Sequence, residues 1–230
     1  MRVRAIVIFL IALAGCGAAV AAQMNDQWHV IEVDWDVEEE GYTNSGQYTI
    51  IYGLEEAKAT SENCIDDDCE SDNEEEKMSK IVENCNSQDD EERKEDCEAI
   101  AAATTNTLYA MNGVYGWGLF AVLASLFAII GISGNKFAGF FTLILSVLLF
   151  ATAIYHIMTF PEIGDTFTGD DDDNQINVSE YPGQATWILG GAGILTLIGA
   201  VLGLRGGSKD DGYSDIPESG SSYYHGSWQD

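Results

Sequence analysis

Four long apolar runs alternate with strongly polar segments along the 230-residue chain. These runs cover residues 5–22, 111–132, 137–160 and 185–204, and none contains Asp, Glu, Lys or Arg. At about 1.5 Å per helical residue, 18 residues reach about 27 Å, close to the roughly 30 Å hydrocarbon core of a bilayer. The pattern therefore predicts four membrane-spanning helices, of which the first is only just long enough.

Between the first two runs the hydrophobic period changes from that of a helix to that of a strand. Every second residue is apolar over residues 31–37 and again over residues 48–54. The turn-forming stretch TNSG, residues 43–46, lies between them. We predict an antiparallel hairpin with its turn at TNSG, joined by a short third strand.

The next stretch, residues 70–98, is dominated by Glu, Asp, Lys, Ser and Asn. Such acid density alone is typical of disorder, but cysteines in the same region indicate that it is pinned. Residues 73–85 fit one amphipathic helix, and residues 89–106 fit another that runs into the second apolar run. We therefore predict an acidic helical insertion.

Four cysteines, Cys64, Cys69, Cys85 and Cys97, lie in the segment between the first two runs. An even number of cysteines in an oxidising compartment predicts disulfides. Of the three pairings that four cysteines allow, we favour Cys64–Cys69 with Cys85–Cys97 over a nested pattern, although sequence does not fix the connectivity.

A transition-metal site at CIDDDC, residues 64–69, would need reduced thiolates and histidines nearby. The three histidines, at positions 29, 156 and 225, fall on a strand, in the third run and in the tail. We expect that they do not converge, and that His156 lies at the outer membrane interface. A structural disulfide is therefore favoured over a metal site.

Basic residues orient the chain. They precede the first run, lie in the turn 133–136 and follow the fourth run, at Arg2, Arg4, Lys136, Arg205 and Lys209. The positive-inside rule makes this side cytoplasmic, with both termini, in a cell (plasma) membrane.

Residues 23–110 and 161–184 then lie outside, and residues 205–230 form a disordered cytoplasmic tail. The outer segments hold 33 of the 38 acidic residues, so the net charge of −28 faces outward. Like-charge repulsion excludes nucleic acid as a partner of that face, and the lipid bilayer is the first expected partner.

The first run, residues 1–22, has three interpretations. A continuous apolar span of 18 residues favours an uncleaved helix. A basic start and an Ala-rich exit also fit a cleaved secretory signal. The sequence LAGC matches the bacterial lipobox, in which Cys16 would be lipidated after cleavage. The rest of the topology is the same in each case.

The second outer segment contains a partial calcium-binding pattern. Asp170, Asp172 and Asn174 occupy positions 1, 3 and 5 of a calcium loop, but Gln175 and Tyr181 stand where the EF-hand needs Gly and Glu. The pattern is compatible with weak Ca²⁺ association and predicts no firm metal site and no cofactor.

Two further surface features are candidates. Glu32, Asp34 and Asp36 share one face of a strand, where they would attract cations or simply keep an edge strand solvated. Asn177 begins the sequon NVS, a glycosylation candidate in a host that glycosylates.

The apolar runs carry small residues. Gly199 and Gly203 form a G-x-x-x-G, which permits close helix packing within the bundle. No phosphate-binding loop or nucleophile–base arrangement is evident, so we expect no enzymatic activity.

Specific motifs resemble the claudin and epithelial/peripheral-myelin membrane protein superfamily. DQWHV after the first run is similar to that family's opening strand with its tryptophan, here Trp28. YGL, residues 52–54, followed by Cys64 and Cys69, is similar to its W…GLW…C…C signature, although Glu55 replaces the second tryptophan. AIYHIMTFPEI at the end of the third run resembles the epithelial branch.

The resemblance implies an all-α four-helix transmembrane bundle with a small extracellular β-sheet, to which this chain adds its acidic helical insertion. It implies a non-enzymatic role in cell contact, barrier or envelope organisation, through self-association. The alternative is an accessory subunit or sensor of a channel, transporter or receptor. That role is suggested by the aromatic residues of the polar tail and requires another membrane protein as partner.

Overall fold

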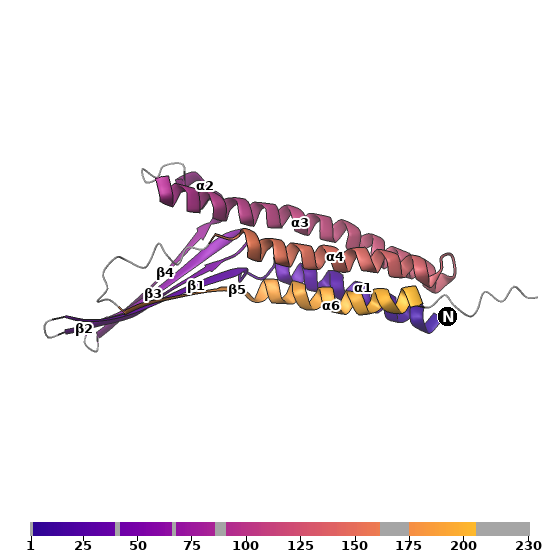
Figure 1. The fold of residues 1–230 in the computed structure, drawn as a ribbon, viewed down its shortest axis with the longest axis horizontal. Helices are drawn as coiled ribbons and strands as arrows, with labels where there is room; N and C mark the ends of the chain where they lie inside the picture. The colour runs from indigo at the N-terminus through magenta and orange to yellow at the C-terminus, as the bar shows by residue number, and fades with distance from the viewer. Residues whose placement is uncertain (1, 40–41, 66–67, 86–90, 162–174, 206–230) are drawn as a thin grey trace, which may run out of the picture.

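The computed structural model describes residues 2–39, 42–65, 68–85, 91–161 and 175–205. Four long helices lie side by side, and a β-sheet projects from one end of this bundle along the same long axis (Figure 1). The elements in chain order are α1 (Arg2–Gln23), β1 (His29–Glu39), β2 (Tyr42–Tyr52), β3 (Glu56–Ile65), β4 (Asp68–Lys77), α2 (Met78–Cys85), α3 (Glu91–Ile130), α4 (Asn135–Thr159), β5 (Gln175–Pro182) and α6 (Gln184–Arg205).

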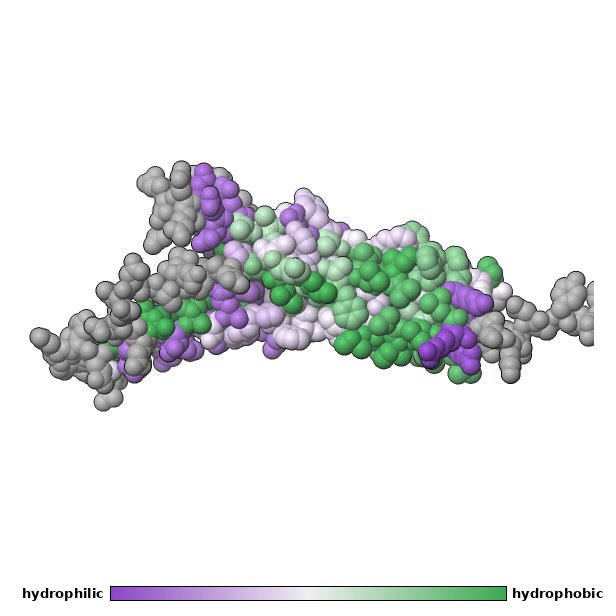
Figure 2. Space-filling model, viewed as in Figure 1, coloured by the Kyte–Doolittle hydropathy of each residue, from purple (hydrophilic) through white to green (hydrophobic). Residues whose placement is uncertain are grey.

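The four predicted spans correspond to helices α1, α3, α4 and α6, which are long and apolar enough to cross a membrane. Their small and hydroxyl-bearing residues face inward, as Thr142 and Ser146 do, while large apolar side chains such as Val147 and Phe140 are exposed. This distribution is typical of helices that face lipid. Figure 2 shows the resulting hydrophobic surface over the bundle.

Glycines allow the helices to approach closely. A Cβ on Gly203 of α6 would lie 2.6 Å from the Cα of Gly139 in α4, and one on Gly199 would lie 2.7 Å from Ile11 in α1. Gly199 and Gly203 therefore serve packing within the chain, as the G-x-x-x-G pattern predicts.

Helix α3 is the longest element, with 40 residues. At 1.5 Å per residue it reaches about 60 Å, roughly twice the hydrocarbon thickness of a bilayer. Its N-terminal half therefore extends beyond the bundle and packs Ile100 and Ala103 onto the sheet. The predicted helix that runs into the second span is confirmed.

The sheet has five antiparallel strands in the order β4-β3-β2-β1-β5. Alternation along β1 places Ile31 and Val33 on the face that α2, α3 and Phe160 cover. Glu32, Asp34 and Asp36 lie on the opposite face, because neighbouring side chains in a strand point to opposite sides.

The sheet is larger than the predicted hairpin, and its turn is elsewhere. Residues 43–46 lie inside β2, opposite residues 35–38 of β1. The expected turn at TNSG is therefore wrong. Gly46 is needed within the strand because a Cβ there would overlap the Trp35 ring and the Glu62 carbonyl oxygen.

The acidic insertion is only partly helical. Residues 68–77 form strand β4, and only Met78–Cys85 form the helix that was expected over residues 73–85. Pairing with β3 accounts for the difference, because it satisfies the backbone groups of β4 and sets Glu75 opposite Lys58. The Met78 N–H donates to the Glu55 carbonyl at 2.8 Å, which fixes the start of α2.

Cys64 and Cys69 face each other across β3 and β4 and form a disulfide. The CIDDDC stretch therefore closes a hairpin at the end of the sheet, as predicted. Cys97 is also disulfide-bonded, and its sulfur lies 3.7 Å from the Ile81 carbonyl oxygen of α2. The side chain of Cys85 lies outside the described residues, so the predicted Cys85–Cys97 pair stays a prediction.

Candidate functional site

The sheet joins the bundle through the main chain around Trp28. The Trp28 N–H donates to the Tyr52 carbonyl at 2.9 Å, and the Trp28 carbonyl accepts from the Gly183 N–H at 2.9 Å and from the Thr186 hydroxyl at 3.1 Å. The Trp28 ring is fully buried. These contacts connect β1 to β2 and to the start of α6, and we refer to this region as the junction.

Gly183 makes that connection sterically feasible. A Cβ at this position would overlap the carbonyl group of Gln27. The neighbouring Ala185 N–H donates to the Gln27 carbonyl at 2.9 Å. The last residues before α6 are therefore held directly against the first residues before β1.

Two histidines meet inside the junction. His29 of β1 stacks on Phe160 with ring centroids 3.8 Å apart, and its centroid lies 6.4 Å from that of His156 in α4. His156 is fully buried, and His29 is 8% exposed. The expectation that the histidines do not converge is wrong for this pair. His156 lies near the end of α4 and is buried inside the protein, and its position at the outer membrane interface stays a prediction.

Few polar groups form hydrogen bonds with the nitrogens of these two imidazole rings. The Nδ1 atom of His156 lies 3.1 Å from the Thr107 hydroxyl. Its Nε2 lies toward the Trp28 main chain without a hydrogen bond of ordinary geometry, and neither nitrogen of His29 has a partner among the described residues. Burial lowers the pKa of His29 to about 4, because the charged ring would lose its hydration.

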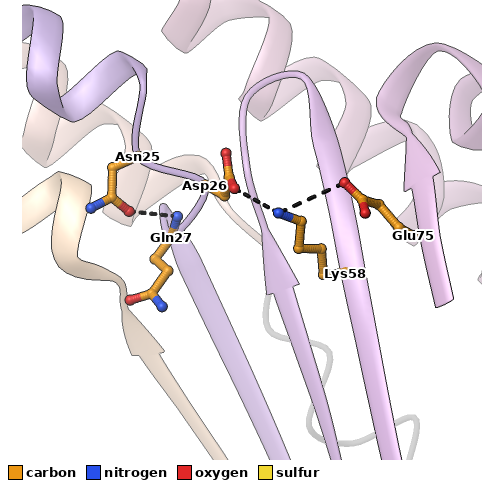
Figure 3. Close-up of polar contacts among 5 residues, drawn as sticks. All are labelled: Asn25, Asp26, Gln27, Lys58 and Glu75. Carbon is orange, nitrogen blue, oxygen red and sulfur yellow. Dashed lines mark hydrogen bonds and ion pairs between the residues drawn. The ribbon is translucent and has the colours of Figure 1, made fainter. Parts of the chain in front are cut away.

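A charged cluster lies on the opposite, polar side of the sheet, near the same junction. The Lys58 ammonium of β3 lies 2.7 Å from Asp26 and 3.7 Å from Glu75 of β4 (Figure 3). The hydrogen bond to Asp26 raises the pKa of Lys58, and a hydrogen bond that the protonated Glu56 carboxyl donates to Glu75 raises the pKa of Glu56. All four side chains are solvated, so the cluster contributes little stability.

An open groove of about 470 Å³ lies beside this cluster. Its lining includes the apolar residues Val20, Met24 and Leu54 and the acidic residues Asp26 and Glu56. The groove lies at the end of the sheet that joins the bundle, and apolar and acidic side chains line it together.

No known protein family matches this chain. No curated protein matches it either. The junction must therefore be interpreted from its own chemistry.

The predicted cation-binding face lies on the polar side of the sheet. Asp34 is opposite Asn177 of β5, and Glu32 accepts a hydrogen bond from the Tyr181 hydroxyl at 2.6 Å. This hydrogen bond raises the pKa of Tyr181 to about 12. Strand β1 pairs on both sides, with β2 and β5, so the alternative that its acids protect an edge strand is wrong.

The described residues do not include the predicted calcium ligands of the second outer segment. Asp170, Asp172 and Asn174 lie outside those residues. Glu62, Cys64 and Cys69 lie close enough to hold a metal, but the two sulfurs form a disulfide and are not thiolates. Asn177 is exposed on β5, where the sequon is accessible.

Sequence reasoning missed β5 and the histidine pair. Ile176 and Val178 alternate with polar residues, and this short strand signal was present beside the calcium-like pattern. The histidine pair had no local signal, because it depends on where α4 ends relative to the start of β1.

Proposed function

We propose that this protein is a non-enzymatic, claudin-like membrane protein that acts in cell contact, barrier or envelope organisation. The observation that supports the proposal is the sheet, in which a strand from the second outer segment pairs with a strand from the first. The two segments thus form one body that is fixed on the bundle through Trp28.

The orientation is part of the proposal. The positive-inside rule places the sheet, α2 and the start of α3 outside the cell, with both termini in the cytoplasm. The polar face of the sheet, including Asp34 and Gln47, would then be presented to a neighbouring membrane or a neighbouring copy. A rigid ectodomain of this kind suits contact between molecules better than chemistry on a small substrate.

The test is self-association of the full chain between membranes. Two vesicle populations with different fluorescent lipids, each carrying the protein, should cluster with one another. The variant Asp34→Lys should change the extent of clustering because it reverses charge on the exposed face, whereas Asp215→Lys in the tail should not. The absence of both vesicle clustering and crosslinked dimers in the parent protein would contradict the contact function.

A second candidate is an accessory subunit of another membrane protein. An aromatic cluster on the outer surface of α3 and α4 favours it, since Trp117 packs with Phe120 and Phe141 at centroid distances of 5.9 and 5.8 Å. Phe120 is 56% exposed, so this cluster could contact another helix.

Crosslinking in native membranes from a photoreactive residue at position 120 separates the two candidates. A stoichiometric, unrelated partner supports the subunit. Crosslinks to a second copy support the contact protein.

A further inference from the structure

The two buried histidines belong to different parts of the molecule. His29 begins the first strand of the sheet, whereas His156 lies near the end of α4 in the bundle. Phe160 and Trp28 complete the contact, with ring centroids 3.8 Å from His29 and 5.2 Å from His156 respectively. Separating the sheet from the bundle would therefore expose both imidazoles to water.

The contact between the two histidines suits neutral imidazole rings, because it provides few hydrogen-bond acceptors for protonated ones. A protonated imidazole has two N–H donors, and each needs an acceptor. Neither nitrogen of His29 has a partner among the described residues, and Phe160 covers its face. A charge on either ring would also lie beside the other imidazole, which disfavours a second charge.

The surrounding elements supply few compensating charges. Strand β2 contributes Tyr52, whose pKa burial raises to about 12, so this phenol stays neutral. Strand β5 contributes Glu180, opposite Ile31, and β4 contributes Glu76, opposite Ala57 in the row that also holds Tyr52 and His29.

The helices add few charges near the pair. Helix α2, which covers the same face of the sheet, carries Lys80 and Glu83, and both are exposed to solvent. Helix α3 has no charged residue after Glu98, and α1 has none after Arg4. Within the described part of α4 and α6, the charged residues Lys136 and Arg205 lie at the far end of the bundle. Glu180 therefore lies on the strand next to that of His29, and Glu76 lies three strands away in the same row.

We propose that His29 and His156 form a proton-operated latch that holds the sheet against the bundle at neutral pH and releases it as acid protonates the imidazoles. Acidification on the side of the bundle where the sheet lies would thus allow the sheet to move relative to the bundle. It is independent of the function proposed above, because it concerns only how the sheet is held.

The direction and size of the effect follow from linkage. The pKa of His29 falls from 6.5 in water to about 4 when the ring is buried, so the released state binds the proton first. Docking is therefore strongest above pH 6.5, weakens as the pH falls and stops changing near pH 4. One ring alone raises the ratio of released to docked protein roughly 30-fold between neutral pH and pH 5.

Hydrogen–deuterium exchange of the full chain in lipid nanodiscs tests the latch. The amides of Trp28, Gly183 and Ala185 donate across the junction and report its opening. After correction for intrinsic exchange, we expect their opening to increase by at least about 30-fold from pH 7.5 to pH 5, while amides in the middle of α4 change little.

The variant His29→Phe keeps an aromatic ring on Phe160 and cannot take up a proton there. Its junction should therefore lose the roughly 30-fold response that His29 contributes and keep only the response that His156 supplies. His225→Gln, in the tail, should respond like the parent. Glu180→Gln removes the neighbouring carboxylate as a possible source of the pH response. This variant should also respond to pH like the parent. A pH response in His29→Phe as large as that of the parent would overturn the proposal. Loss of the pH response in Glu180→Gln alone would do the same.

A second measurement does not depend on the folding of a variant. In the parent labelled with ¹⁵N-histidine, the imidazole signals of the docked protein should show His29 neutral at pH 5. Titration of His29 near its ordinary pKa of 6.5 while the sheet is still docked would rule out the latch.

Discussion

At the scale of single residues, Trp35 and Gly46 show how one side chain fixes another position. Trp35 lies opposite Gly46 in the β1–β2 register, and its ring occupies the space that a side chain at Gly46 would need. In the sequence this glycine is typical of a turn, but in the structure it lies inside a strand and leaves space for the Trp35 ring.

The substitution Gly46→Ala should destabilise the sheet by about 1–3 kcal/mol, because the new Cβ would overlap Trp35 and the Glu62 carbonyl. Thermal unfolding followed by near-UV circular dichroism measures the loss. The matched control is Gly113→Ala in α3, where a Cβ meets nothing within 4 Å. That change should be neutral or slightly stabilising, since alanine favours helix. Equal effects from both variants would contradict the packing role of Gly46.

Single residues also show which parts of the site could be predicted from the sequence. Alternation identified which residues of β1 face inward, since Ile31 and Val33 are buried and Asp34 is exposed. The histidine contact could not be predicted in this way. His29 and His156 are 127 positions apart, and their meeting depends on the relative placement of a strand and a helix.

At the scale of elements, β4 is the least expected strand. Six of its ten residues are acidic, a composition that disfavours strands and typically indicates disorder or a solvated helix. Tertiary constraints override this preference. The Cys64–Cys69 bond joins β4 to β3 at one end, and the Met78–Glu55 hydrogen bond holds the other.

Replacing both Cys64 and Cys69 by serine should weaken the β3–β4 hairpin by roughly 2 kcal/mol, because the bond closes only a short loop. Hydrogen–deuterium exchange should become faster near the cysteine end of β3 and β4 and stay unchanged in β1 and the bundle. Cys16→Ser, which alters the free cysteine of α1, serves as control and should leave the hairpin unaffected. Loss of protection throughout the sheet would show that the disulfide supports more than its own hairpin.

At the scale of the whole molecule, charge and hydrophobicity are separated along the long axis. The face of the bundle seen in Figure 2 is mainly apolar, and 33 of the 38 acidic residues lie in residues 23–110 and 161–184, between the apolar runs. The four apolar helices were predictable because their signal is long and local. The five-stranded sheet was not, because its last strand is supplied by a distant part of the chain.

If two copies meet through their sheets, their like charges repel at low ionic strength. Vesicle clustering should therefore increase as NaCl is raised, because the Debye length shortens from about 30 Å at 0.01 M to about 8 Å at 0.15 M. The triple variant Glu32→Gln, Asp34→Asn, Asp36→Asn should cluster at lower salt than the parent. Clustering that falls with added salt would instead indicate contact between oppositely charged surfaces.

The pairing of β5 with β1 also sets an order of events during synthesis. His29 pairs with Pro182, so the ribosome must add 153 residues, including two complete spans, before that pair can form. At about 5–20 residues per second this takes roughly 8–30 s. Throughout that interval one side of β1 remains open to other nascent chains or to a chaperone, and only arrival of the last loop closes it.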